Sequence, residues 1–395
     1  MADHAKLSAS GSHIWLNCTT SVQMSEGFPD KQTAYTEEGT LAHRLAELEI
    51  GKIYKLVSAK SYKDGLKTVK ESQYYTEELK SYVKNYVDWV EEIYNGVKEK
   101  SADHEILTEQ RLDFSTWVPG GFGTGDVVII ADGTLTVIDL KYGKGVPVEA
   151  RENPQLMLYG LGAYDAFSLS NDIQRIRMII NQPRLDSISE FEISVEDLLK
   201  WGEEVVKPKA AMAIKGEGEA HPGDWCRFCK CKAICRARAE EALEIAKYEF
   251  RDPPLLEDGE ISDILGRAAR IQSWISDVKE YAQEEAEKGR QWPGWKLVEG
   301  RSNRKYSDPQ EVEKRLLAAG FEKVLLYKDP ELLGITAMEK VVGGKKKLET
   351  LIAGLIVKPP GAPTLVPESD KRPALNTAKE DFKEHSCDSE LTSIE

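Results

Sequence analysis

The sequence lacks any apolar run near the roughly 20 residues needed to cross a bilayer, and its N-terminus lacks the basic-then-apolar pattern of a secretion signal. We therefore expect a cytoplasmic protein with no membrane partner. It also lacks an excess of basic residues, since the net charge is -14 at pH 7. That charge argues against nonspecific coating of nucleic acid, so any contact with DNA needs bound metal or a local basic patch. A Walker motif, a Ser-His-Asp arrangement and internal repeats are absent as well.

The length and composition are typical of a large globular protein, since the chain has 395 residues and 41% of them are hydrophobic. The first half alternates between helical and strand patterns. We expect helices over 40–49, 76–97 and 195–214 and a helix that begins at Asn153-Pro154, with strands over 105–113, 126–131, 134–141, 174–182 and 189–193. This order predicts a mixed α/β (α+β) core, a mixed sheet flanked by helices, behind a helical N-terminal region.

The second half predicts a smaller accessory region. Helical patterns extend to about 247 and from 261 to 287, a small α/β segment covers 292–356, and a Pro-rich, aromatic-poor tail begins at 358. We divide the chain into a main domain at 1–250, an accessory region at 255–357 and a flexible tail at 358–395. Residues 301–349 carry 11 Lys/Arg against 8 Asp/Glu, which is either a DNA-contacting patch or a solvated surface.

The most informative segment is the hairpin that runs from Gly125 to Lys141. Two β-rich stretches surround Asp132-Gly133, a favoured two-residue turn, and this turn places Asp126 opposite Asp139. Facing carboxylates on one side of a hairpin repel and call for a compensating cation. Strand alternation puts Lys141 on the same face as Asp139. Two carboxylates and an ammonium predict a divalent-metal site that activates water against a phosphodiester.

Two helices offer further candidates. His43 and Glu47 lie one helical turn apart on the first helix, and Gln155 and Tyr159 lie one turn apart on the helix that follows the hairpin. Either pair on its own is also typical of ordinary, partly buried helix residues.

Cysteines gather between 226 and 235. Cys226, Cys229, Cys231 and Cys235 have the spacing of metal ligands, and thiolates at this spacing hold zinc or an iron-sulfur cluster. Cys387 in the tail is most simply a free surface thiol.

Taken in order, these motifs resemble the RecB/AddB branch of the PD-(D/E)XK nuclease superfamily. The motifs are Gly39 with His43, then Gly125-Asp126, Asp139-Leu140-Lys141, Gln155 with Tyr159, and Cys18 with a C-x2-C-x5-C group. The resemblance implies a restriction-endonuclease-like core. Within it, the implied ligands of Mg2+ or Mn2+ are His43, Asp126, Asp139 and the Leu140 carbonyl.

The same resemblance implies roles for other residues. Lys141 would position the attacking water, while Gln155 and Tyr159 would support the site or contact DNA; Glu47, Glu109 and Lys144 are further candidates for support or DNA contact. Cys18, Cys226, Cys229 and Cys235 would hold a 4Fe-4S cluster that staples the N-terminal helices to the core. Cys231 is extra, which leaves a swapped ligand or a zinc site open.

The implied activity is that of a metal-dependent DNA exonuclease. Its substrates would be DNA ends or single strands, and its partner a single-strand annealing protein or a helicase in phage-type recombination. The alternatives are a structure-specific DNA or RNA endonuclease of the same fold and a catalytically silent DNA-binding or assembly protein.

Overall fold

The computed structural model describes residues 5–29, 33–145, 147–244, 256–300, 302, 304–328, 331–367 and 372–375. The chain forms two compact units, Met1–Trp274 and Ile275–Glu395. Within the described ranges no helix has the length and apolar character that a membrane span requires.

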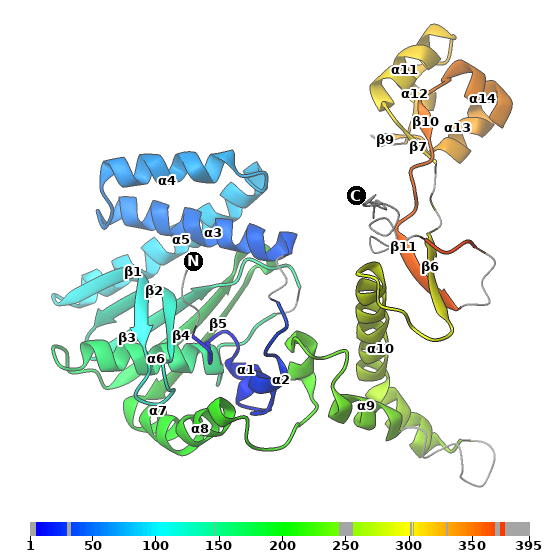
Figure 1. Cartoon of the computed structure of the whole chain (residues 1–395). Helices are drawn as coiled ribbons and strands as arrows, with labels where there is room; N and C mark the ends of the chain where they lie inside the picture. Colours follow the sequence, from blue (N-terminus) through cyan, green and yellow to red (C-terminus); the bar gives the residue numbers. More distant parts are fainter. Residues whose placement is uncertain are drawn as a thin grey trace, which may run out of the picture. The chain divides into compact units, whose positions relative to one another are not determined.

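The first unit is built around one five-stranded mixed sheet (Figure 1). Its strands are β1 (His104–Asp113), β2 (Phe122–Ala131), β3 (Thr134–Leu140), β4 (Arg175–Gln182) and β5 (Ser187–Ser194), which lie in that order. Only β3 and β4 pair in parallel, and the other neighbours are antiparallel. The parallel step requires a crossover, and helix α6 (Pro154–Phe167) supplies it.

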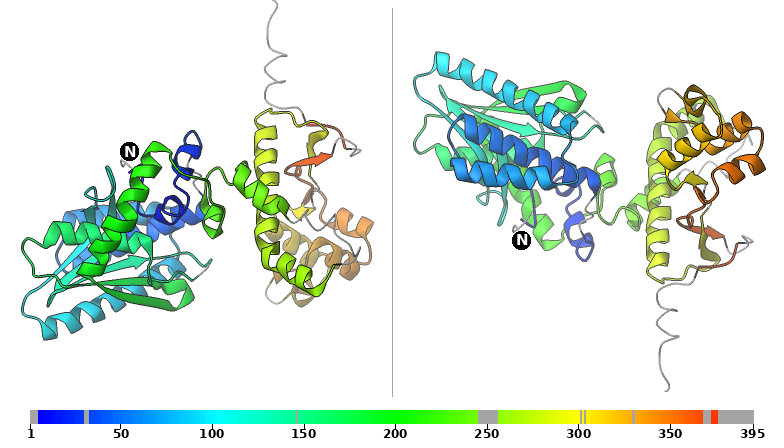
Figure 2. Two further views of the ribbon diagram at one scale, coloured as in Figure 1. Left: turned by 90° about the horizontal axis from the view of Figure 1, so that it is seen from below. Right: turned by 90° about the horizontal axis from the view of Figure 1, so that it is seen from above.

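Helices cover both faces of this sheet (Figure 2). The helices α3 (Ala34–Ile53), α4 (Ala59–Glu71) and α5 (Glu77–Lys100) pack on one face, where Ile129 and Ile138 join their buried side chains. On the other face α6 packs with helical segments that precede and follow the sheet. These segments are α1 (Ser12–Trp15), α2 (Ser21–Met24), α7 (Val195–Trp201), the π-helical turn η2 (Gly202–Val206) and α8 (Lys207–Lys215). Helix α9 (Arg236–Leu243) follows them in the chain and contributes no residue to this core. The predicted mixed α+β class and the helical N-terminal region are confirmed.

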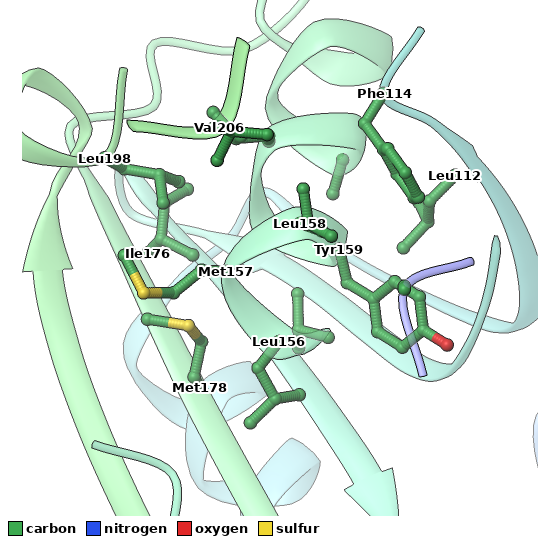
Figure 3. Packing of buried hydrophobic residues seen from close by; sticks show 14 of the residues in the cluster. Leu112, Phe114, Leu156, Met157, Leu158, Tyr159, Ile176, Met178, Leu198 and Val206 are labelled. Atoms are coloured by element: carbon green, nitrogen blue, oxygen red, sulfur yellow. The ribbon is translucent and has the colours of Figure 1, made fainter. Parts of the chain in front are cut away.

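Helix α6 is the most buried helix of the unit. Leu156, Met157 and Leu158 pack against strand residues such as Met178 (Figure 3). Tyr159 sits at the edge of this cluster with its hydroxyl directed away from it. A helix that is apolar nearly all round has to be buried, which fixes its register against the sheet.

Local sequence signals set the ends of the elements that carry the site. Asp132 and Gly133 have φ values of 47° and 66°, the backbone of a two-residue hairpin turn. The Asn153 side chain accepts hydrogen bonds from the backbone N–H groups of Gln155 and Leu156, and Pro154 opens α6. Both predictions are confirmed.

The second unit continues from the long helix α10 (Asp258–Glu287), within which the boundary between the units falls. Its small core contains Val312, Leu316, Met338 and Leu348. The remaining elements are β6 (Trp295–Glu299), β7 (Lys305–Tyr306), α11 (Pro309–Ala318), α12 (Lys323–Leu326), β8 (Tyr327–Lys328), β9 (Glu331–Leu332), α13 (Ile335–Val342), α14 (Lys345–Leu351), β10 (Ile356–Val357) and β11 (Pro363–Pro367).

Three segments differ from the sequence-based expectation. Helix α4 was not predicted, and the predicted helix over 195–214 is interrupted by the π-helical turn at 202–206. Pro363–Pro367, in the stretch predicted as a tail, pairs with β6 as strand β11. Most of the remaining tail, including Cys387, lies outside the described residues.

Candidate functional site

The hairpin of β2 and β3 places the two predicted aspartates opposite each other. Val127 pairs with Ile138, and the next positions along the two strands are Asp126 and Asp139. Asp126 reaches across to β3, where its Oδ2 accepts a hydrogen bond from the Leu140 N–H at 2.7 Å. The register derived from the Asp-Gly turn is therefore confirmed.

Asp139, Lys141, Gln155 and Tyr159 form one hydrogen-bonded network. Lys141 Nζ lies 2.9 Å from Asp139 Oδ2 and donates to Gln155 Oε1 at 2.9 Å. Gln155 Nε2 donates to Asp139 Oδ1 at 3.2 Å and to the Tyr159 hydroxyl at 3.1 Å. The ammonium can only donate, so it fixes the orientation of the Gln155 amide.

Burial and charge act against each other in this network. Burial lowers the pKa of Lys141, but the attraction of Asp139 outweighs it and raises the pKa, so Lys141 stays a cation. Burial also raises the pKa of Asp139, although Lys141 opposes that rise. Burial raises the pKa of Tyr159, which therefore remains a neutral phenol. The network holds a buried carboxylate and a buried ammonium in contact.

A second group forms on the α3 side of the hairpin. Ligand atoms of His43, Glu109 and Asp126 all lie within 4.8 Å of one another, a spacing that can hold a metal ion. His43 Nδ1 lies 3.0 Å from Asp126 Oδ1. Burial lowers the pKa of His43, but the Asp126 carboxylate outweighs it and raises the pKa to about 9. His43 and Asp126 are thus brought together as predicted, and Glu109 joins them directly.

Glu109 has an unusual backbone for a strand residue. Its φ is 48°, the left-handed region, while its neighbours Thr108 and Gln110 pair normally with Val127 and Gly125. A strained non-glycine residue of this kind costs about 1–3 kcal/mol and is retained only where its surroundings hold it. The distortion lies directly opposite Asp126.

Two carboxylates crowd Glu109. Burial raises its pKa to about 7, and the charges of Asp126 and Glu47 add to this rise. Glu47 itself pairs with Arg44 on the same helix. A cation among these groups would offset the repulsion that now raises the pKa of Glu109.

The helix that carries His43 is anchored at its N-terminal end. Thr33 caps it, accepting from the Thr36 N–H at 3.2 Å. Arg184, just after β4, donates to Glu38 at 2.9 Å and lies 4.7 Å above the Tyr142 ring. Arg184 therefore links the start of α3 to the segment that follows Lys141.

A family model matches residues 4–373, and its description is "Protein of unknown function (DUF2800)". The chain belongs to the DUF2800 family. Among solved structures, one titled "Crystal structure of SSO0001" is similar at 16% sequence identity. The match covers 57% of this chain and 96% of that chain, with a TM-score of 0.22.

In this DUF2800 chain a cavity of about 1120 Å³ opens beside Lys141 and His43. Among its lining residues are five arginines: Arg151, Arg227, Arg238, Arg267 and Arg270. Arg151 lies 5.3 Å above the Phe191 ring and Arg227 lies 5.6 Å above the Phe228 ring. Neither forms an ion pair with another of the described residues, so their N–H donors can receive an anion.

The cysteines meet at a second, much smaller cavity. Five thiols line it, those of Cys18, Cys226, Cys229, Cys231 and Cys235. Cys229 Sγ and Cys231 Sγ lie 3.4 Å apart, and their hydrogen bond lowers the pKa of Cys229 and raises that of Cys231. Among the described residues, no three thiol sulfurs lie within 4.8 Å of one another, the separation that defines the group of His43, Glu109 and Asp126.

The other predicted residues have plain surroundings. Lys144 Nζ pairs with Glu78 Oε1 at 2.9 Å on the exposed surface. Gly123 lies within β2, where a Cβ would come 2.6 Å from Tyr159 Cε1. The small residue therefore makes room for the Tyr159 ring.

Sequence reasoning missed His13 and Arg184. Burial lowers the pKa of His13, which a backbone hydrogen bond to Ser10 opposes, and the Lys141 charge lowers it further. Neither residue belongs to a recognisable local pattern, because each reaches the site from a segment distant in sequence.

Proposed function

We propose that this DUF2800 chain is a divalent-metal-dependent DNA exonuclease of the RecB/AddB-like branch of the PD-(D/E)XK superfamily. The observation that carries the proposal is that two groups meet at one hairpin. His43, Glu109 and Asp126 gather within 4.8 Å, and Asp139 lies beside them in contact with Lys141. Acidic clusters are common on protein surfaces, but a buried carboxylate and ammonium beside such a cluster match what hydrolysis of a phosphodiester requires.

The residues present fit a hard divalent cation. Carboxylate oxygens are the ligands that Mg2+ and Mn2+ prefer, and an imidazole nitrogen suits Mn2+. Asp126 and Glu109, with His43, would hold the ion, and Asp139 and the Leu140 carbonyl remain predicted ligands. A bound cation supplies a water of lowered pKa and neutralises charge on the phosphate.

The protein's own groups would complete the site. Lys141 carries a fixed positive charge that can stabilise charge developing on the phosphate oxygens. Gln155 accepts a hydrogen bond from Lys141 and so fixes the direction of the Lys141 ammonium. Gln155 in turn donates to the Tyr159 hydroxyl, which holds the Gln155 side chain in place. Catalysis of this kind depends on groups held in place before the substrate arrives, and the buried helix α6 provides that rigidity.

The thiols fit an iron-sulfur cluster. Cys18 comes from the N-terminal segment and meets Cys226, Cys229 and Cys235 at one cavity. Thiolates hold both zinc and iron-sulfur clusters, and the resemblance to the RecB/AddB branch favours a 4Fe-4S cluster. Such a cluster closes a long loop and would stabilise the fold.

The arginines of the large cavity fit a DNA backbone. The chain as a whole is acidic at -14, but Arg151 and Arg227 line the cavity beside Lys141 and offer donors to phosphates. We place the enzyme in end resection for phage-type recombination or repair, in the cytoplasm of a bacterial host. A single-strand annealing protein or a helicase would be its partner.

The test is digestion of end-labelled DNA by the full-length protein. Linear and circular substrates, single- and double-stranded, are incubated with Mg2+, Mn2+ or EDTA. We expect metal-dependent cutting of linear DNA alone, lost in Asp139→Asn and retained in Asp172→Asn, which changes an exposed carboxylate distant from the site.

Other outcomes contradict the proposal in different ways. Cutting of circles would indicate an endonuclease of the same fold. Binding without cutting under every metal condition would indicate a silent DNA-binding protein. Normal digestion by Asp139→Asn would contradict the assignment of the active site to this hairpin.

A further inference from the structure

Phe228 is an exposed aromatic residue at the edge of the cavity that contains Lys141. Phe228 is 63% exposed, although the next residue in the chain, Cys229, is buried. Isolated exposed apolar residues are common, so exposure alone says little. The position matters, because His43, Lys141 and Phe228 line the same cavity.

The backbone presents Phe228 to that cavity. A short turn of 3-10 helix covers Asp224–Phe228, with the Cys226 N–H bonded to the Gly223 carbonyl at 3.0 Å. The Cys229 N–H is bonded to the Cys226 carbonyl at 3.1 Å. Cys226 and Cys229 face the small thiol cavity, whereas Arg227 and Phe228 line the large one.

Other groups bracket the Phe228 ring. Arg227 lies 5.6 Å above it, and the ring of His13 meets it edge-on at 5.4 Å. His13 is near enough to Lys141 for the Lys141 charge to contribute to its lowered pKa, after burial and the opposing Ser10 hydrogen bond.

We propose that Phe228, flanked by Arg227, is a stacking platform for an unpaired base, so that the nuclease acts on DNA with single-stranded ends. The proposal rests on the proposed function and names its substrate class. An aromatic ring stacks on the face of any base, whereas a duplex offers such a face only at its terminal pair. The guanidinium of Arg227 adds a phosphate contact next to the stacked base.

The experiment measures binding of a single-stranded oligonucleotide that carries 2-aminopurine, whose fluorescence falls on stacking. Full-length protein is titrated in EDTA at fixed salt, so that no cleavage occurs. Phe228→Ala should bind roughly 5- to 150-fold more weakly and lose the quenching, because a base-aromatic stack contributes that much. Phe228→Trp should bind within about 2-fold of the parent. Blunt duplex binding should be nearly unchanged.

Tyr35→Ala is the matched control, because Tyr35 is an aromatic residue 83% exposed on α3 and does not line the cavity. Equal iron and zinc contents in all variants show that the thiol cavity is intact. Single-strand binding by Phe228→Ala that equals the parent overturns the stacking proposal, as does full binding by Phe228→Leu, which keeps bulk without a π face.

Digestion of linear DNA in Mg2+ separates the two proposals. If the parent protein cuts DNA while Phe228→Ala binds single strands normally, the nuclease assignment stands and the stacking proposal is wrong. A parent protein that neither binds nor cuts DNA removes both.

Discussion

Replacing Gln155 by leucine tests the hydrogen-bonded network that positions the Lys141 ammonium. The change removes three hydrogen bonds, to Lys141 Nζ, Asp139 Oδ1 and the Tyr159 hydroxyl. Bonds to charged groups contribute about 1.5–3 kcal/mol each and a neutral bond about 0.5–1.5 kcal/mol. Gln155 is only partly buried, so water will replace some of them. We expect the free energy of unfolding to fall by about 2–4 kcal/mol.

Urea denaturation followed by circular dichroism measures this loss, and an unchanged m-value shows that the same surface unfolds. Leucine is as good a helix former as glutamine, so α6 itself should not suffer. Gln174→Leu is the control, because Gln174 is exposed and its side chain donates a hydrogen bond to the nearby Asp172. It should change stability by less than about 0.5 kcal/mol.

The variant should also lower the single-turnover cleavage rate about 10- to 100-fold, since a displaced Lys141 no longer meets the phosphate correctly. A Gln155→Leu protein with parental stability and parental rate would refute the reasoning.

Three further predictions concern the neighbouring groups. Gly123→Ala places a Cβ 2.6 Å from Tyr159 Cε1 and should cost about 1–3 kcal/mol in urea denaturation; a smaller than additive loss in Gly123→Ala/Tyr159→Leu would confirm the clash. Mn2+ at about 100 times its dissociation constant should stabilise the parent by about 2.7 kcal/mol in thermal unfolding, and Glu109→Gln should abolish most of that gain; an equal gain in both proteins would argue against the site. Cys229→Ser should lose iron and unfold at lower urea concentration, with Cys387→Ser as the unaffected control, and a parent free of iron when purified without oxygen would contradict the cluster.

The sequence was most informative where a local rule controls the backbone. Asp132-Gly133 defines a tight turn, and the turn fixes the register that sets Asp126 opposite Asp139. Asn153-Pro154 caps α6 and thereby fixes where Gln155 and Tyr159 point. These signals act over a few residues, so one sequence is enough to interpret them.

Features that depend on distant contacts were harder to predict. Glu109 enters the group of possible metal ligands through a left-handed backbone in mid-strand, a strain that only the surrounding sheet can impose. Arg184 and His13 reach the site from segments far along the chain. The strand Pro363–Pro367 forms because β6 offers it a partner, although its prolines argue against a strand.

The most direct test of the account is the anomalous diffraction of Mn2+ in crystals of the protein soaked with that ion. We predict a peak within bonding distance of Asp126, with His43 and Glu109 or Asp139 completing the ligands. Absence of Mn2+ from this hairpin under saturating conditions would contradict the proposed metal site.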